Sequence, residues 1–191
     1  HEPGRPARPR PGLVLYSEIF QQTAPVRRLA AQFASLGYVV AVPEVYHAHE
    51  PPGCVLGYDD AGKARGNALK QVVRLADFDA DARVVVDALT RHPGCTGSVG
   101  AVGICLGGHL AFRAALLPAV RAAACFYPTD LHTGTLSAGG GADTLARAGE
   151  IRGELLLVFG RQDPHVPAAG RRAIYEALDA AGVWFTWHEF N

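Results

Sequence analysis

The sequence lacks an excess of either charge and lacks any long apolar run. Lysine plus arginine and aspartate plus glutamate number 18 each, which leaves no net charge. Nothing in this balance favours nucleic acid or an anionic membrane surface as a partner. The longest apolar runs, such as Leu155 to Phe159, are far too short to span a bilayer. No signal peptide with a basic start, an apolar middle and a small-residue cleavage site is visible.

Cysteine is scarce and widely spaced. The four residues are Cys54, Cys95, Cys105 and Cys125, and none stands in the CxxC or CxxH spacing of a zinc site. They are too few for a disulfide scaffold, and the chain is too large to need one. We therefore expect a reducing, cytoplasmic setting, with no membrane association. Motifs that cradle phosphates, G-x-x-x-x-G-K-[ST] and G-x-G-x-x-G, are also absent, which argues against nucleotide and dinucleotide binding.

The composition is that of an ordinary globular domain, with 49% hydrophobic and 19% charged residues. The 191 residues suffice for one domain with a real core, and no repeat or linker divides them. We expect a single domain over residues 1–191, in which the proline- and arginine-rich residues 1–11 form an extended lead-in. Because the sequence starts at His1 and stops at Asn191 directly after a strand-like run, we expect residues to be missing at one or both ends.

Apolar runs and amphipathic stretches alternate along the chain. Runs that are apolar throughout suit strands buried on both faces, whereas residues such as Val26, Leu29 and Phe33 share one face of a helix. We expect strands at 13–16, 38–42, 98–104, 120–127, 155–159 and 183–189, and helices at 25–36, 63–73, 78–91, 106–117 and 168–181. This order predicts an α/β fold built on a doubly wound, mostly parallel sheet with helices on both faces.

The most distinctive motif is Gly103-Ile104-Cys105-Leu106-Gly107-Gly108, at an expected strand-to-helix junction. It matches the nucleophile elbow with cysteine in place of serine. Glycines two residues before and after the nucleophile let the strand and the helix approach closely. The N–H of Leu106 opens the helix and points toward the site, and a helix N-terminus lowers a thiol pKa. The motif predicts Cys105 as the nucleophile; the alternative is a buried core cysteine beside a glycine-rich turn.

Two further positions fit the same arrangement. Asp163 follows the strand at 155–159, where the chain order nucleophile, acid, base places the acid that orients the base imidazole. The turn after the first strand contains Glu18 and Ile19. In this fold the turn supplies one of the two backbone N–H groups that bind the oxyanion, so we expect these donors to be Ile19 and Leu106. The Glu18 carboxylate on the same turn would lie near the thiol. The alternatives are a turn or capping role for Asp163 and a solvent-facing position for Glu18.

In this order, Glu18-Ile19-Phe20, the elbow and Phe159-Gly160-Arg161-Gln162-Asp163 resemble the dienelactone hydrolase family of the α/β-hydrolase superfamily. The resemblance covers roughly residues 12–191 and implies a triad of cysteine, histidine and aspartate. It implies that Glu18 contacts and helps to activate the thiol. It also implies a carboxymethylenebutenolidase-type enzyme that hydrolyses a small ester or lactone without metal or cofactor. We expect a monomer or a small homo-oligomer.

The base and the substrate-binding arginines are two of the three points where the sequence departs from the family; the third is Glu44, which replaces the aspartate of a Pro-Asp pair after the second strand. The family histidine lies a few residues beyond the last strand, so we expect it just after Asn191, with His188 as a candidate inside the chain. His165 is expected to be a loop or pocket residue, and His109 a packed or capping one. Arginines that bind a substrate carboxylate in the family have no clear match here, and Arg65 and Arg74 are candidates.

Two other interpretations of the sequence remain open. One is a thiol redox sensor that uses Cys105, although no resolving cysteine is obvious in the sequence. The other is a non-catalytic binding protein on the same fold, since a fold does not by itself establish a function.

Overall fold

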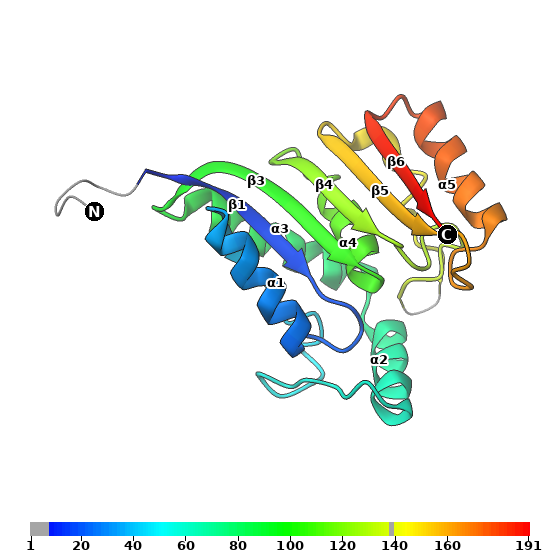
Figure 1. Ribbon diagram of the computed structural model, residues 1–191, viewed down its shortest axis with the longest axis horizontal. Helices are drawn as coiled ribbons and strands as arrows, with labels where there is room; N and C mark the ends of the chain where they lie inside the picture. The colour runs from blue at the N-terminus through cyan, green and yellow to red at the C-terminus, as the bar shows by residue number, and fades with distance from the viewer. Residues whose placement is uncertain (1–7, 138–139) are drawn as a thin grey trace.

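The computed structural model describes residues 8–137 and 140–191, and within them six strands form one sheet in the order β2-β1-β3-β4-β5-β6 (Figure 1). Every neighbouring pair runs parallel, as the uniformly apolar strands predict. The strands are β1 (Arg10–Tyr16), β2 (Val39–Ala41), β3 (Cys95–Ile104), β4 (Val120–Phe126), β5 (Glu154–Gly160) and β6 (Phe185–Phe190). The helices are α1 (Ala24–Ser35), α2 (Asp60–Val72), α3 (Leu75–Arg91), α4 (Leu106–Ala114) and α5 (Ala168–Ala180), with a short 3-10 helix, η1, at Ala148–Glu150.

Helices cover both faces of the sheet. Side chains alternate along a strand, so Leu13 and Leu15 of β1 pack with Val26 of α1 on one face, whereas Val14 joins the main core on the other. In Figure 1, α1 crosses in front of the sheet, and α3 and α4 lie behind it. The main core also includes Ile174 of α5. The prediction of a doubly wound parallel sheet is confirmed.

The strand order places a topological switch point between β1 and β3. The chain moves from β1 outward to β2, and then returns to β3 on the opposite side of β1. Connections from the two strands therefore diverge at their carboxyl ends, which is where open α/β sheets bind ligands. Helix α2 stands away from both faces, beyond these carboxyl ends (Figure 1).

Helix α4 is the most deeply buried helix among the described residues, since every residue from Leu106 to Ala114 is buried. It packs against β1, β3 and β4, and most of its side chains are small or apolar. His109 and Arg113 are the exceptions, and each must find partners inside the protein because an unpaired buried polar group is costly.

Several element boundaries differ from the sequence prediction. Strand β1 begins at Arg10, which pairs with Cys95, so the end of the expected lead-in belongs to the sheet; residues 1–7 lie outside the described residues. Helix α2 begins earlier than expected because the Asp59 carboxylate caps it, accepting a hydrogen bond of 2.7 Å from Gly62 N–H. Helix α4 ends at Ala114 rather than at residue 117, just before a turn that leads to Pro118.

Over residues 8–137 and 140–191, no helix combines the length and the apolar character needed to cross a bilayer. All four cysteines are free thiols. Cys125 is fully buried, as its apolar strand predicts.

Candidate active site

Cys105 occupies a strained turn between β3 and α4. Its backbone has φ 59° and ψ −119°, a conformation that non-glycine residues rarely adopt and that typically marks a functional position. The flanking glycines make this turn possible. A Cβ atom on Gly103 would lie 1.8 Å from the carbonyl oxygen of Gly107, and one on Gly107 would lie 2.3 Å from that of Tyr16. The structure therefore has the geometry of a nucleophile elbow.

Backbone hydrogen bonds fix Cys105 against the strand beside it and the loop that follows. The Cys105 N–H donates to the Phe126 carbonyl of β4 at 3.0 Å, and the Thr129 N–H donates to the Cys105 carbonyl at 3.3 Å. Because β4 and the segment after it hold the backbone on both sides of the sulfur, the thiol direction is set by the fold rather than by a mobile loop.

The thiol faces a cavity of about 250 Å³ at the carboxyl ends of β1, β3 and β4. Residues from the turn after β1, one face of α2, the elbow, the segment after β4 and the loop after β5 line it. They are Glu18, Ile19, Phe20, Lys63, Asn67, Lys70, Cys105, Tyr127, Thr129, Asp130 and His165. The structure thus brings Glu18, Ile19 and Cys105 together at the switch point of the sheet.

The pKa of the Cys105 thiol is raised, first of all because burial disfavours the thiolate. The N–H of Leu106, the Thr129 hydroxyl and the Lys70 ammonium act in the opposite direction, and the Glu18 carboxylate adds to the rise. The N–H of Leu106 at the helix N-terminus lowers the thiol pKa as expected, but burial outweighs it. A raised pKa favours the neutral thiol, which needs a base to become a nucleophile.

Glu18 is held by a tyrosine from the loop before α2. The Tyr58 hydroxyl donates to Glu18 Oε1 and also shares a hydrogen bond of 2.9 Å with the Thr23 hydroxyl. The Tyr58 ring lies 4.6 Å from that of Phe20, centroid to centroid. These contacts fix the carboxylate on the cavity wall that also contains Ile19.

Asp163 is not among the residues that line the cavity, although His165, two residues later, is. Asp163 Oδ1 accepts a hydrogen bond of 2.8 Å from the His165 N–H, so the carboxylate caps the turn after β5. Its charge is also felt at Tyr127, whose pKa is raised to about 12 by burial and then by the negative charges of neighbours that include Glu18 and Asp163.

His188, the candidate base inside the chain, and His165, the expected pocket residue, occupy different places. His165 lines the cavity that contains Cys105. His188 lies in β6, is exposed and stacks on Phe190 with ring centroids 6.1 Å apart; it is not among the cavity residues.

Sequence reasoning missed the contribution of α2. Lys63, Asn67 and Lys70 follow the i, i+4, i+7 spacing that places side chains on one helix face, and that face lines the cavity. Lys70 Nζ donates to Asp130 Oδ2 at 2.8 Å. This spacing was the available signal, but nothing local indicated that the helix stands over the carboxyl ends of the strands.

Arg65 and Arg74 do not line the cavity, contrary to their expected candidacy. Arg65 Nε lies 2.6 Å from Glu50 Oε1, and Arg74 pairs with Asp77 at 2.6 Å within its own helix turn. Both guanidinium groups are engaged at the surface, so the cavity's cationic groups are lysines.

The sequence model described as "Dienelactone hydrolase family" matches residues 2–191. A provisionally named carboxymethylenebutenolidase of Saccharomyces cerevisiae is 43% identical over 190 residues, which are 97% of this chain and 69% of that protein. The carboxymethylenebutenolidase of Pseudomonas putida is 30% identical over 179 residues, 93% of this chain and 71% of that protein.

A crystal structure of a provisionally named dienelactone hydrolase from Klebsiella pneumoniae subsp. pneumoniae superposes with a TM-score of 0.79 at 23% identity. The match covers 99% of this chain and 77% of that chain. This likeness confirms the predicted α/β-hydrolase fold.

Proposed function

The chain belongs to the dienelactone hydrolase family, and on that premise we propose that it hydrolyses a small-molecule ester or lactone through the Cys105 thiol. The hydrolase class follows from the family; the residue assignments are our proposal. The observation that supports them best is the positive φ of Cys105, which turns a half-buried thiol into the cavity at the switch point. A structural cysteine in the core would have no need of this strained backbone.

The proposed reaction proceeds through a thioester. A histidine base takes the thiol proton as the Cys105 sulfur attacks the carbonyl carbon, and the N–H groups of Ile19 and Leu106 stabilise the oxyanion. Donors of this kind contribute roughly 3–4 kcal/mol each to the transition state. The tetrahedral intermediate expels the alkoxide or enolate, which takes the proton from the imidazolium. Water, deprotonated by the same imidazole, then attacks the thioester, and the acid and the thiol are released.

We propose that the base is a histidine that follows Asn191, oriented by Asp163. The register of β5 and β6 supports this position, because Gly160 lies opposite Phe190 and the Arg161 N–H donates to the Phe190 carbonyl at 2.7 Å. The chain therefore leaves β6 beside the loop that contains Asp163. His165 is the alternative, since it already lines the cavity, although its backbone rather than its ring is bonded to Asp163.

Lys63 on the cavity wall favours a substrate with a negative group beside the ester. Lys63 and Lys70 reach the cavity from α2. Lys70 is paired with Asp130, so Lys63 is the better placed of the two to attract an anion. A carboxylated lactone, as in the name of the carboxymethylenebutenolidase relatives, fits this arrangement.

Selective alkylation combined with ester hydrolysis tests the assignment of Cys105. Because the proposed histidine base takes the Cys105 proton, we expect iodoacetamide to label Cys105 faster than Cys54 and Cys95, and the labelling to abolish hydrolysis of a nitrophenyl ester. Cys105→Ala should be inactive, whereas Cys95→Ala, a matched loss of a half-buried thiol, should retain activity. Full activity in Cys105→Ala would refute the assignment, and reversible peroxide oxidation of Cys105 without hydrolysis would favour the redox-sensor hypothesis.

A further inference from the structure

His109 lies on α4, one helical turn after Cys105, and is fully buried. Its ring makes two side-chain hydrogen bonds, with Nδ1 2.9 Å from the Thr129 carbonyl oxygen and Nε2 2.7 Å from the Thr144 hydroxyl. His109 is not among the residues that line the cavity. The proposed hydrolysis gives this buried imidazole no task, so its two contacts need an explanation of their own.

Hydrogen bonds join Arg113, Thr144, His109 and Thr129 in a path that ends beside Cys105. The donor and the acceptor of each bond along this path can be assigned. A carbonyl oxygen only accepts, so His109 Nδ1 must hold the proton that bonds Thr129. Arg113 donates to the Thr144 hydroxyl oxygen at 2.7 Å, which leaves the Thr144 proton to bond His109 Nε2. Burial lowers the pKa of His109 to about 4, which keeps the imidazole neutral, as this assignment requires.

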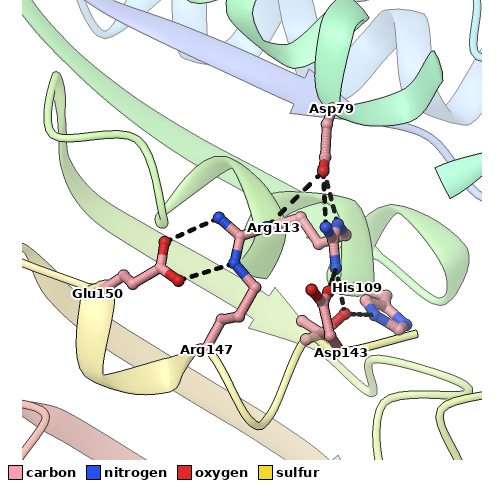
Figure 2. A network of polar contacts seen from close by, with 7 residues as sticks. Asp79, His109, Arg113, Asp143, Arg147 and Glu150 are labelled. Carbon is pink, nitrogen blue, oxygen red and sulfur yellow. Dashed lines mark hydrogen bonds and ion pairs between the residues drawn. The ribbon is translucent and has the colours of Figure 1, made fainter. Parts of the chain in front are cut away.

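The far end of the path is rigid because Arg113 is held by carboxylates (Figure 2). Its guanidinium is 2% exposed and forms two hydrogen bonds of 2.7 Å to Asp79 and one of 3.0 Å to Asp143. Arg147, which pairs with Glu150 at 2.7 Å, lies 3.8 Å from the same Asp79 carboxylate. The network joins α3, α4 and the segment around η1 behind the nucleophile.

The near end of the path is Thr129, whose hydroxyl lies 3.9 Å from Cys105 Sγ. Thr129 lies two residues after Tyr127, with φ 35°, and directly before Asp130, with φ 61°, so the segment adopts a conformation that its surroundings must enforce. A β-branched side chain has few χ1 choices once its backbone is fixed. Holding the Thr129 carbonyl therefore also holds the direction of its hydroxyl.

We propose that His109 is a positioning residue for the nucleophile: it holds the Thr129 carbonyl so that the Thr129 hydroxyl stays directed at the Cys105 sulfur and stabilises the thiolate. The inference rests on the proposed role of Cys105. It assigns to His109 no contact with substrate and no proton transfer. The hydrogen bonds that run from Arg113 through Thr144 and His109 to Thr129 hold the Thr129 hydroxyl in one orientation before the thiol ionises.

Two amide substitutions separate this role from simple packing. In His109→Asn the amide nitrogen stands where Nδ1 stood and can still donate to the Thr129 carbonyl. In His109→Gln it stands near the former Nε2 and reaches Thr144 instead. We expect His109→Gln to raise the pH midpoint of Cys105 alkylation by iodoacetamide by about one unit and to slow alkylation near neutral pH about tenfold. His109→Asn should stay within about threefold of the parent.

Three further variants make the test decisive. Thr129→Val should match His109→Gln. Thr129→Ser, which keeps the hydroxyl but loses the β-branch, should fall between Thr129→Val and the parent. The double variant His109→Gln/Thr129→Val should react no more slowly than Thr129→Val alone. Ser137→Ala, which removes a buried hydrogen bond of 2.6 Å to the Val73 carbonyl, is the matched control and should leave the alkylation profile unchanged.

The outcomes distinguish this inference from the proposed function. If Cys105 of the parent protein is alkylated no faster than Cys54 or Cys95, the proposed function itself fails. If Cys105 is selectively alkylated but His109→Gln and His109→Asn share one pH profile of alkylation, the positioning role is wrong. It is also wrong if the rate reductions of His109→Gln and Thr129→Val add in the double variant. Circular dichroism of each variant establishes that the folded protein is being compared.

Discussion

Arg113→Met is expected to destabilise the protein by about 3 kcal/mol, because it removes the centre of a buried ion network. Breaking a buried pair by deleting one partner costs about 3–5 kcal/mol, since the remaining charge stays desolvated. Here Asp79 is 19% exposed and would lose both of its short hydrogen bonds to the 2%-exposed Arg113. Methionine replaces the apolar stem of the arginine, so little cavity is added.

Two features of the network set the expected loss near the lower end of that range. Arg147 lies 3.8 Å from Asp79 and can partly replace the lost charge, and Asp143 is 51% exposed and can be hydrated. With an m-value of roughly 2 kcal/mol/M in urea for a protein of this kind, the unfolding midpoint should fall by about 1.5 M. Urea titration followed by circular dichroism measures this shift.

The double variant Arg113→Met/Asp79→Leu is the control. It removes both charges, and replacing a buried pair by apolar residues is often close to neutral, so most of the lost stability should return. A loss below about 1 kcal/mol in Arg113→Met, or a double variant that is less stable than the single one, would refute the reasoning.

Further predictions concern the elbow, the buried histidine and the cavity charge. Gly107→Ala should cost about 1–3 kcal/mol and most of the ester hydrolysis, because its Cβ would lie 2.3 Å from the Tyr16 carbonyl oxygen; Gly149→Ala, with nothing within 4 Å, should change stability by less than about 0.5 kcal/mol in the same urea titration. The pKa of His109 is lowered from 6.5 to about 4 in the folded protein. As the pH falls, the unfolded chain therefore protonates this imidazole before the folded protein does. The free energy of unfolding should therefore decline as the pH falls from about 6.5 toward 4, by up to roughly 3 kcal/mol from this residue, and equilibrium unfolding at several pH values should show no such contribution in His109→Asn. Lys63→Met should raise the KM for a carboxylated nitrophenyl ester several-fold, by roughly 1 kcal/mol of lost attraction, and leave the KM for a neutral ester unchanged; equal effects on both esters would argue against anion recognition.

The elbow could be predicted from the sequence because its determinants are local. Gly103 and Gly107 flank Cys105 within five residues, and each glycine is required by a close backbone approach that the structure shows. The strands of the sheet were predictable for the same reason, since uniformly apolar runs are typical of strands buried on both faces.

The α2 wall and the network behind the nucleophile could not be predicted, because they depend on contacts between distant segments. Lys70 meets Asp130 across 60 residues, and Arg113 meets Asp79 and Asp143 across 34 and 30. No local pattern indicates which charges pair in this way. The net rise of the Cys105 pKa could not be predicted for a related reason, since burial by the whole fold outweighs the N–H of the neighbouring residue.

The most direct test of the account is the identification of a covalent intermediate. The protein is mixed with nitrophenyl acetate, quenched in acid within the first turnover and digested, and its peptides are mapped by mass spectrometry. We predict an acetyl group on the peptide that contains Cys105, formed together with a burst of nitrophenol and absent from Cys105→Ala. Turnover of the ester without acetylation at Cys105, or acetylation that persists at another residue in Cys105→Ala with activity intact, would contradict the assignment of Cys105 as the nucleophile.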